Sequence, residues 1–166
     1  MVLTPSQAKT FYDRFGSKQD AQAFYEDAAI GDLIAHAGFE QAERVFELGC
    51  GPGRLALRLL SKHLPSSASY LGIDVSQTMI DLAKQRLSSF AERARVERSD
   101  GSMQFPLPDH SVDRFVSTYV FDLLSDQDID RAIREAHRHL YGVYPHAGSA
   151  QQLLLPPLEI LLVGHL

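Results

Sequence analysis

Residues 45–54 are Val-Phe-Glu-Leu-Gly-Cys-Gly-Pro-Gly-Arg, the most informative stretch of the chain. The first four are apolar apart from Glu47, which is typical of a short strand buried on both faces of a parallel sheet. Gly49, Gly51 and Gly53 then alternate. Glycine accepts a positive φ and lets a ligand approach the backbone closely. Leucines recur at helical spacing in the residues that follow. We therefore predict a strand, a tight glycine turn and a helix.

A second apolar run, Tyr70–Ile73, ends on an acid. Asp74 lies 21 residues beyond Gly53. In open parallel sheets ligands bind outside the carboxyl ends of the strands, and an acid there can accept hydrogen bonds from both hydroxyls of a ribose. The free N–H groups at the start of the first helix favour a carboxylate or another anion. Together the two strands predict a site for an adenosine-containing cofactor.

The glycine spacing separates two classes of cofactor. The dinucleotide fingerprint needs a glycine three residues after the second one, and counting from Gly51 that position holds Arg54. The pattern is GxGxG, which favours S-adenosylmethionine, while a nicotinamide oxidoreductase stays as an alternative. A merely flexible turn is disfavoured because strand, turn, helix, strand and acid occur in order. Cys50 is interpreted as a small turn residue and not as a nucleophile.

Strand and helix patterns alternate along the chain and predict an α/β fold with a doubly wound, mostly parallel sheet. Two helices should precede the sheet and lie over the mouth of the cofactor site. The expected helices are Thr4–Phe15, Gln19–Ala37 with an interruption near Gly31, Gly53–His63, Ser76–Phe90 and Asp126–Leu140. The expected strands are Arg44–Leu48, Ser69–Asp74, Ala94–Arg98 and Asp113–Tyr119. Ser76 should cap its helix, and Ser125 or Asp126 should cap the last one.

Asp100 follows the third expected strand, at the same edge as Asp74. Its carboxylate could accept from an adenine amine while the next backbone N–H groups donate to a ring nitrogen. The alternative is an Asx-turn, in which Asp100 caps its own backbone. The sequence leaves both interpretations open.

Length and composition fit one domain with a substantial core, since the chain has 166 residues, 45% hydrophobic and 22% charged. We expect this domain to span 1–166, with N-terminal helices in 1–40, a cofactor-binding core in 41–140 and a tail in 141–166. A net charge of −5 disfavours a general nucleic-acid surface, so no nucleic-acid partner is expected.

The single cysteine excludes an intramolecular disulfide and fits a reducing compartment, so a cytoplasmic protein is expected. The longest apolar run, Leu153–Val163, contains two prolines and a glutamate and is too short to span a bilayer. No spacing of histidine, cysteine, aspartate or glutamate suggests a metal site.

Several ordered motifs resemble those of class I S-adenosylmethionine-dependent methyltransferases. Glu47–Gly53 resembles their motif I, Gly72–Met79 their second motif, and Asp100–Asp113 their adenine segment and the approach to the fourth strand. The subgroup most similar in pattern is the small-molecule methyltransferases of ubiquinone and menaquinone biosynthesis. The resemblance covers about residues 44–140 and implies a Rossmann-like sheet.

The resemblance also implies roles for individual residues. It implies that the methionine part of the cofactor is surrounded by Glu47, Gly49, Gly51 and Gly53. It implies that the adenosine part is held by Asp74 at the ribose, Val75 and Met79 beside the adenine, and Asp100 and Gly101 at the adenine edge. Tyr119 matches a position that faces the methionine moiety and the acceptor, and Tyr12 resembles an N-terminal aromatic that covers the cofactor in some members.

Methyl transfer is an in-line displacement, in which the protein mainly aligns acceptor, methyl and sulfur and excludes water. A general base is needed only if the acceptor has a proton to lose. The catalytic residues are not identified by the sequence; Asp122 and Tyr119 are candidates. His110 is expected in an exposed turn, and His137 and His139 are expected to be solvated.

The C-terminal part departs from the family. A Pro-Gly-Gly turn usually follows the last helix expected here, and it is missing after Leu140. The 26 remaining residues are too few for the usual strand, helix and closing strand pair. Leu153–Val163 could supply one strand, although Pro156 and Pro157 oppose central pairing. We therefore expect an atypical, shortened C-terminus that leaves the strand at Asp113–Tyr119 near an exposed edge, open to a second copy or another protein.

The leading hypothesis is an S-adenosylmethionine-dependent methyltransferase that acts on a small molecule. The alternative is a catalytically impaired relative that works as a cofactor-binding or regulatory partner.

Overall fold

The structure of the protein is a computed structural model that describes residues 7, 10, 23–140 and 159–163. The α-helices of this part are α2 (Ala23–His36), α3 (Arg54–Lys62), α4 (Gln77–Arg86) and α5 (Asp126–His139). The strands are β1 (Arg44–Leu48), β2 (Ser69–Asp74), β3 (Ala94–Arg98), β4 (Arg114–Thr118) and β5 (Glu159–Val163). Short 3-10 turns are η2 (Phe39–Gln41), η3 (Ser88–Phe90) and η4 (Phe121–Leu123).

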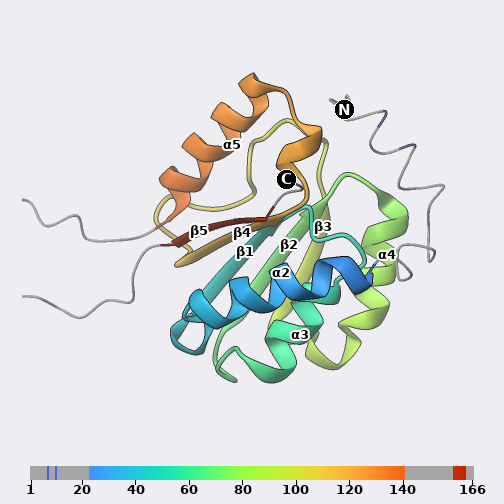
Figure 1. Cartoon of the computed structure of the whole chain (residues 1–166), viewed down its shortest axis with the longest axis vertical. Coiled ribbons are helices and arrows are strands. Elements are labelled where there is room, and N and C mark those ends of the chain that lie inside the picture. The colour runs from blue at the N-terminus through green and yellow to red at the C-terminus, as the bar shows by residue number, and fades with distance from the viewer. Residues whose placement is uncertain (1–6, 8–9, 11–22, 141–158, 164–166) are drawn as a thin grey trace, which may run out of the picture.

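The strands form one sheet in the order β3-β2-β1-β4-β5, and every pair is parallel. Helix α5 covers one face, while α2, α3 and α4 cover the other (Figure 1). The predicted doubly wound α/β fold is thus confirmed. The strand order reverses direction between β1 and β4, and the carboxyl ends of strands at such a switch point are where this architecture binds ligands.

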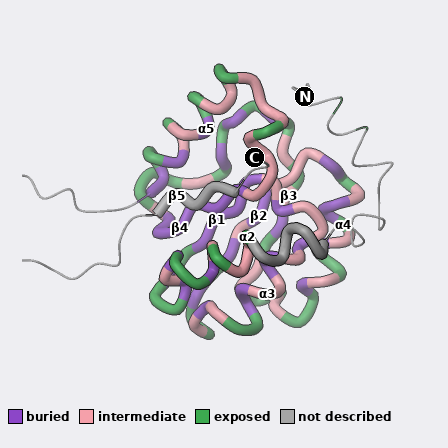
Figure 2. Tube along the Cα trace, in the orientation of Figure 1, coloured by how far each residue is buried: buried purple, intermediate pink, exposed green. Residues whose placement is uncertain are grey.

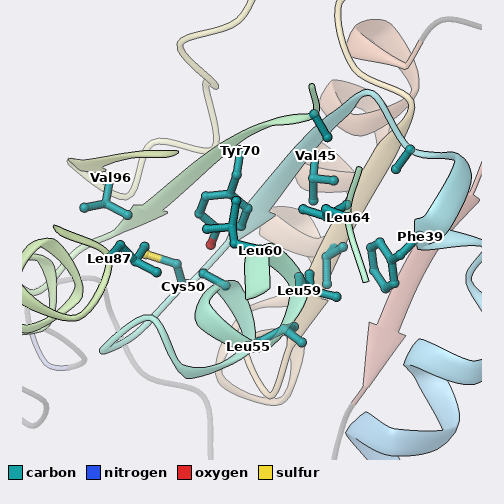
Figure 3. Packing of buried hydrophobic residues seen from close by; sticks show 14 of the residues in the cluster. Phe39, Val45, Cys50, Leu55, Leu59, Leu60, Leu64, Tyr70, Leu87 and Val96 are labelled. Carbon is teal, nitrogen blue, oxygen red and sulfur yellow. The ribbon is translucent and has the colours of Figure 1, made fainter. Parts of the chain in front are cut away.

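Two apolar clusters fill the two faces of the sheet. On the α3 side, Val45 and Tyr70 belong to one cluster with Leu59 of α3 and with Leu87, the residue that follows α4 (Figure 3). On the α5 side three phenylalanine rings, Phe46, Phe105 and Phe115, lie with centroids 5.0 to 5.7 Å apart. Figure 2 shows the result: the central strands β1 and β4 are mostly buried, and exposed residues gather on the outer faces of the helices.

The predicted helix starts are confirmed by their caps. The Ser76 hydroxyl accepts from the backbone N–H of Met79, and the Ser125 hydroxyl accepts from that of Asp128. Gly31 was expected to interrupt its helix, and this prediction is wrong because α2 runs through it. A glycine inside a helix costs only about 1 kcal/mol, which packing of the neighbouring Ile34 can offset.

Two predictions on the last strands have different outcomes. The tail does supply a strand, since β5 pairs with β4 from Glu159 to Val163. The expected exposed edge at β4 is therefore covered: β4 pairs with β1 on one side and with β5 on the other, and β5 is the outermost strand there among the described residues.

Pro156 and Pro157 lie outside the described residues, as does Tyr12 in the first expected helix. In that helix the structure describes Gln7 and Thr10, and both are helical.

The prediction that His139 is solvated is wrong, whereas His137 is exposed. His139 is fully buried: its Nδ1 lies 2.9 Å from the carbonyl of Pro108, and its ring packs on Phe105. The chain that precedes β4 returns across the end of α5, where Ser111 N–H donates to the His139 carbonyl at 2.7 Å. The spacing of residues within the helix could not predict that a loop distant in the sequence covers His139.

A buried arginine ties α2 to the amino ends of the strands. The Arg114 side chain is fully buried, and its Nε donates to the Ala37 carbonyl at 2.9 Å and its Nη2 to the Gly38 carbonyl at 3.1 Å. Next to it, Asp113 Oδ2 accepts from the backbone N–H groups of Glu43 and Arg44 at 2.7 and 3.1 Å. This network lies at the edge opposite the glycine turn and leaves the carboxyl edge for the site.

Candidate cofactor site

The glycine turn joins β1 to α3 and is held against the end of β2. The N–H groups of Gly49 and Cys50 both donate to the carbonyl of Ile73, at 2.8 and 3.0 Å. Gly49, Gly51 and Gly53 all have positive φ, at 76°, 49° and 76°. The turn therefore has a backbone path that only glycine follows without strain, as the sequence predicted.

Two of these glycines differ in the space around them: Gly49 is crowded and Gly51 is not. A Cβ on Gly49 would collide with Cγ2 of Val120, because the chain leaving β4 packs directly on this residue. A Cβ on Gly51 would meet nothing within 4 Å. Gly49 is thus required by the packing of the protein itself, whereas Gly51 leaves space at the surface of the turn. Gly53 serves helix packing, since its Cβ would lie 3.2 Å from Ala83 of α4.

Asp74 ends β2 and faces the turn. Its Oδ2 accepts from the Gly51 N–H at 3.0 Å, and its Oδ1 accepts from the Ser76 N–H at 2.8 Å. The two bonds fix the orientation of the carboxylate and connect it to the glycine turn. The predicted pairing of turn and acid at one edge is therefore observed.

Glu47 lies beneath the turn, on the α3 side of β1. Its side chain is 2% exposed, and Oε2 accepts from the Tyr70 hydroxyl at 2.6 Å. Burial raises the pKa of the Glu47 carboxyl from 4.5 to about 7; the bond from Tyr70 opposes this rise, and the charge of Asp74 adds to it. The carboxyl is thus set up to be neutral at pH values where exposed glutamates are charged.

The Tyr70 hydroxyl reaches Glu47 across Gly72. A Cβ on Gly72 would lie 2.7 Å from both the Tyr70 hydroxyl and Cβ of Cys50, so these two side chains share the space that the glycine leaves. Figure 3 shows Tyr70 and Cys50 within the apolar cluster below the sheet. Burial raises the pKa of the Cys50 thiol well above its ordinary value, which agrees with a packed turn residue and not with a nucleophile.

Asp100 and Gly101 lie next to this edge, where Ser99 N–H donates to the Asp74 carbonyl at 2.8 Å. Oδ1 of Asp100 accepts from the Ser102 N–H at 2.9 Å, so the Asx-turn is present. Hydrogen bonding with Ser102 lowers the pKa of the exposed Asp100 carboxyl. Gly101, the next residue of this turn, has a φ of 82°.

The remaining predicted positions follow the ends of β2 and β4. Val75 is half-buried, and Met79, in the first turn of α4, is 1% exposed. Tyr119 follows β4 with a φ of 59°, one of three non-glycine residues with positive φ in the described part. Strained backbone of this kind is found at functional sites more often than elsewhere. Asp122 is exposed in η4, beyond Tyr119.

The sequence missed two residues that shape the site. Arg86, in the last turn of α4, donates from Nη1 to the Pro52 carbonyl at 2.8 Å and so secures the outer side of the glycine turn. Tyr70 holds Glu47. Neither position carries a motif, because each depends on a partner brought close by the fold.

One observation makes this edge of the sheet suitable for S-adenosylmethionine: Gly51, with open space around its α-carbon, lies next to the oriented carboxylate of Asp74. Within the described residues there is no group of three or more histidine, cysteine, aspartate or glutamate side chains that could hold a metal ion. The described helices include none long and apolar enough to cross a membrane.

Comparisons with known proteins agree with this geometry. Residues 45–141, more than half of the chain, match the methyltransferase domain family. The 2-phytyl-1,4-naphtoquinone methyltransferase of Nostoc is 30% identical over 64% of this chain and 46% of its own length. The tRNA N(3)-cytidine methyltransferase of Danio rerio is 28% identical over 62% of this chain and 30% of its own length.

A solved structure shows the same fold. Phosphoethanolamine N-methyltransferase 1 of Haemonchus contortus, in complex with phosphoethanolamine and S-adenosylhomocysteine, aligns with a TM-score of 0.69 at 21% identity, over 83% of this chain and 30% of that one. The chain spans 38 to 57% of the length of the first curated relatives it matches. From the match over residues 45–141 and the shared fold, the chain belongs to the methyltransferase domain family, within the class I S-adenosylmethionine-dependent methyltransferases.

Proposed function

We propose that this protein transfers a methyl group from S-adenosylmethionine to a small-molecule acceptor in the cytoplasm. The observation that carries the proposal is the junction of Gly51 and Asp74, where open space over the turn meets a carboxylate held by two backbone N–H groups. Asp74 would hold the ribose hydroxyls, and the backbone at Gly51 would lie against the cofactor. Asp100 and Gly101, on the adjoining loop, would lie at the adenine.

The chain's own contribution to the reaction is mainly alignment. S-adenosylmethionine, when bound, supplies the methyl group and a good leaving group. Val120 packs on Gly49 and so fixes the chain after β4 against the cofactor turn. The strained backbone of Tyr119 directs the chain at this junction. Holding acceptor and methyl donor in line can supply a large part of the rate enhancement without a general base.

Three observations support a small-molecule acceptor. Apolar residues Val120, Phe121 and Leu124 lie half-buried where β4 ends, which suits an apolar compound. The net charge of −5 is unlike that of a nucleic-acid surface. The Nostoc relative is a quinone methyltransferase by name. The relative named for tRNA makes RNA the competing acceptor, to be separated by experiment.

Titration with S-adenosylhomocysteine tests the cofactor site. We expect a Kd in the micromolar range, about −8 kcal/mol. Asp74→Ala should weaken binding at least about 100-fold, because hydrogen bonds to a charged group contribute roughly 1.5–3 kcal/mol each. Asp81→Ala is the matched control: it removes the same charge from an exposed position, where Asp81 accepts a hydrogen bond from Gln77 at 2.8 Å. Equal affinities of the two variants would contradict the assignment of Asp74.

The acceptor class is tested with cofactor labelled on the methyl group. Labelled cofactor is incubated with the protein and with either a small-molecule extract or total RNA. Label that enters a low-mass product supports the proposal. Label that enters RNA would replace the small-molecule acceptor by RNA, and cofactor binding without transfer to either fraction would favour the catalytically impaired alternative.

A Gly51→Ala substitution should separate affinity from stability. The added methyl meets no protein atom, so the free energy of unfolding should fall by only about 1–2 kcal/mol for the left-handed backbone. Affinity for S-adenosylhomocysteine should fall at least about tenfold, because the methyl would occupy the space assigned to the ligand. Thermal unfolding and calorimetric titration give the two values. Unchanged affinity would place the cofactor elsewhere.

A further inference from the structure

Beside the glycine turn lies a buried carboxyl group, that of Glu47, which the alignment role does not use. Glu47 is 2% exposed and lies under the glycine turn, and the Tyr70 hydroxyl donates to it at 2.6 Å. Burying a charged carboxylate is expensive unless several donors or an opposite charge compensate it. A neutral carboxyl group avoids that penalty.

The surroundings of Glu47 are apolar or acidic. From β2 come Tyr70 and Asp74, from the turn comes Cys50, and all three interact with Glu47 electrostatically. In register on the neighbouring strands lie Gly72 and Val116.

Helix α3 adds only apolar side chains to this cluster. Its contributions are Leu55, Ala56, Leu59 and Leu60. Its basic residues are less buried than these: Arg54 and Arg58 are partly exposed, and Lys62 is exposed. Among the described residues, the groups that act on the Glu47 carboxyl are the Tyr70 hydroxyl and the Asp74 charge, and neither is a basic group that would hold Glu47 in its charged form.

A cation at the turn would change this balance. In a medium of low dielectric constant a nearby positive charge strongly favours the ionised form of a carboxyl group. The methionine part of the cofactor carries such a charge and would lie on the turn directly above Glu47, an inference that rests on the proposed function. The Tyr70 hydroxyl is already in place to donate to the carboxylate.

We propose that Glu47 is a proton-linked group of the cofactor site, protonated in the free protein and ionised when the cationic methionine part of the cofactor binds over the glycine turn. The O–H bond of the carboxyl group breaks, the electron pair stays on the carboxylate, and the proton passes to the buffer. Tyr70 is a positioning residue that acts through Glu47. It holds the carboxyl group toward the turn and stabilises its charged form, while Gly72 leaves the space for its hydroxyl.

The test counts protons. Calorimetric titration of the full chain with S-adenosylmethionine, which carries the sulfonium cation that S-adenosylhomocysteine lacks, is run without an acceptor at pH 6.5 and pH 8.5, each in two buffers that differ in ionisation enthalpy. With a pKa of about 7 in the free protein, Glu47 is roughly three-quarters protonated at pH 6.5. Binding should therefore release more than about half a proton at pH 6.5 and close to none at pH 8.5.

Two variants keep the test specific. Glu47→Gln keeps an acceptor for Tyr70 but has no proton to lose, so its release should be near zero at both pH values. Tyr70→Phe removes the bond that favours the charged form, so release should persist at pH 8.5. A purely structural role for Tyr70 would change affinity without moving this pH window.

The outcomes distinguish two failures. No binding of S-adenosylmethionine by the wild-type chain at either pH overturns the proposed function and this inference with it. Binding without proton release at pH 6.5, or release that is unchanged in Glu47→Gln, overturns the inference alone and leaves the cofactor site standing.

Discussion

Replacing Arg114 with alanine should lower the free energy of unfolding by about 3–5 kcal/mol, the usual result of removing one partner from a buried ion pair. The Arg114 guanidinium is fully buried and donates to three carbonyls, those of Ala37, Gly38 and Asp113. Its Nη1 also lies 3.9 Å from Oδ1 of the buried Asp113. The substitution would remove these donors while the carbonyl groups and the carboxylate stay buried. The loss of stability therefore comes as much from leaving these buried acceptors without donors as from the lost contacts.

Arg95→Ala is the matched control. Arg95 has the shorter ion pair, 2.7 Å from Nη2 to Oε1 of Glu97, but its side chain is 78% exposed. Water replaces that partner easily, so its loss should lower the free energy of unfolding by no more than about 1 kcal/mol. Chemical denaturation of both variants gives the comparison. If the two substitutions have equal effects, burial of the Arg114 network contributes nothing.

Arg114→Lys extends the comparison in case the alanine variant does not fold. Lysine keeps the charge, but its ammonium cannot reproduce the planar set of donors that reaches Ala37, Gly38 and Asp113 together. It should therefore recover only part of the lost stability. Full recovery would mean that the charge alone stabilises this end of the sheet.

The sheet could be predicted closely because its signals are local. The predicted ranges for β1, β2 and β3 match the observed bounds. The first two contain short apolar runs, and β3 alternates the apolar Ala94 and Val96 with charged residues. Ser76 and Ser125 mark helix starts because the capping bond closes within three residues. Features that depend on residues far apart in the sequence were missed or predicted wrongly. His139 is an example, because the loop that carries Pro108 buries it.

The site divides in the same way. The meeting of Gly51 and Asp74 follows from the order of strand, turn and strand, so the sequence could predict it. Arg86 on Pro52 and Tyr70 on Glu47 could not be predicted, because the residues are separated by 34 and 23 positions and share no motif. Contact of the cofactor with Val75, Met79 and the Asp100 loop stays a prediction.

Glu47→Gln should remove a large pH dependence of stability. In the wild-type protein the pKa of Glu47 is about 7 in the folded state against 4.5 when exposed. The folded state therefore holds a proton that the unfolded state has lost between these two values. The stability due to Glu47 is fully present below about pH 4.5, declines as the pH rises, and is gone above about pH 7.

The size of this effect follows from the shift. A pKa difference of one unit corresponds to 1.36 kcal/mol, so the rise from 4.5 to about 7 represents about 3 kcal/mol. Glutamine is neutral at every pH and keeps an oxygen for the Tyr70 hydroxyl. The variant should thus gain about 3 kcal/mol relative to wild type between pH 4.5 and pH 8, whatever its stability at the acid end.

Urea denaturation at half-unit steps of pH measures this difference directly. Glu40→Gln removes the same charge from an exposed position in η2 and should follow the wild-type curve. Using the difference between variants cancels the other carboxyl groups, which titrate in all three proteins. If the Glu47→Gln and wild-type curves run parallel between pH 4.5 and pH 8, Glu47 is ionised in the folded free protein. There would then be no proton for the cofactor to displace.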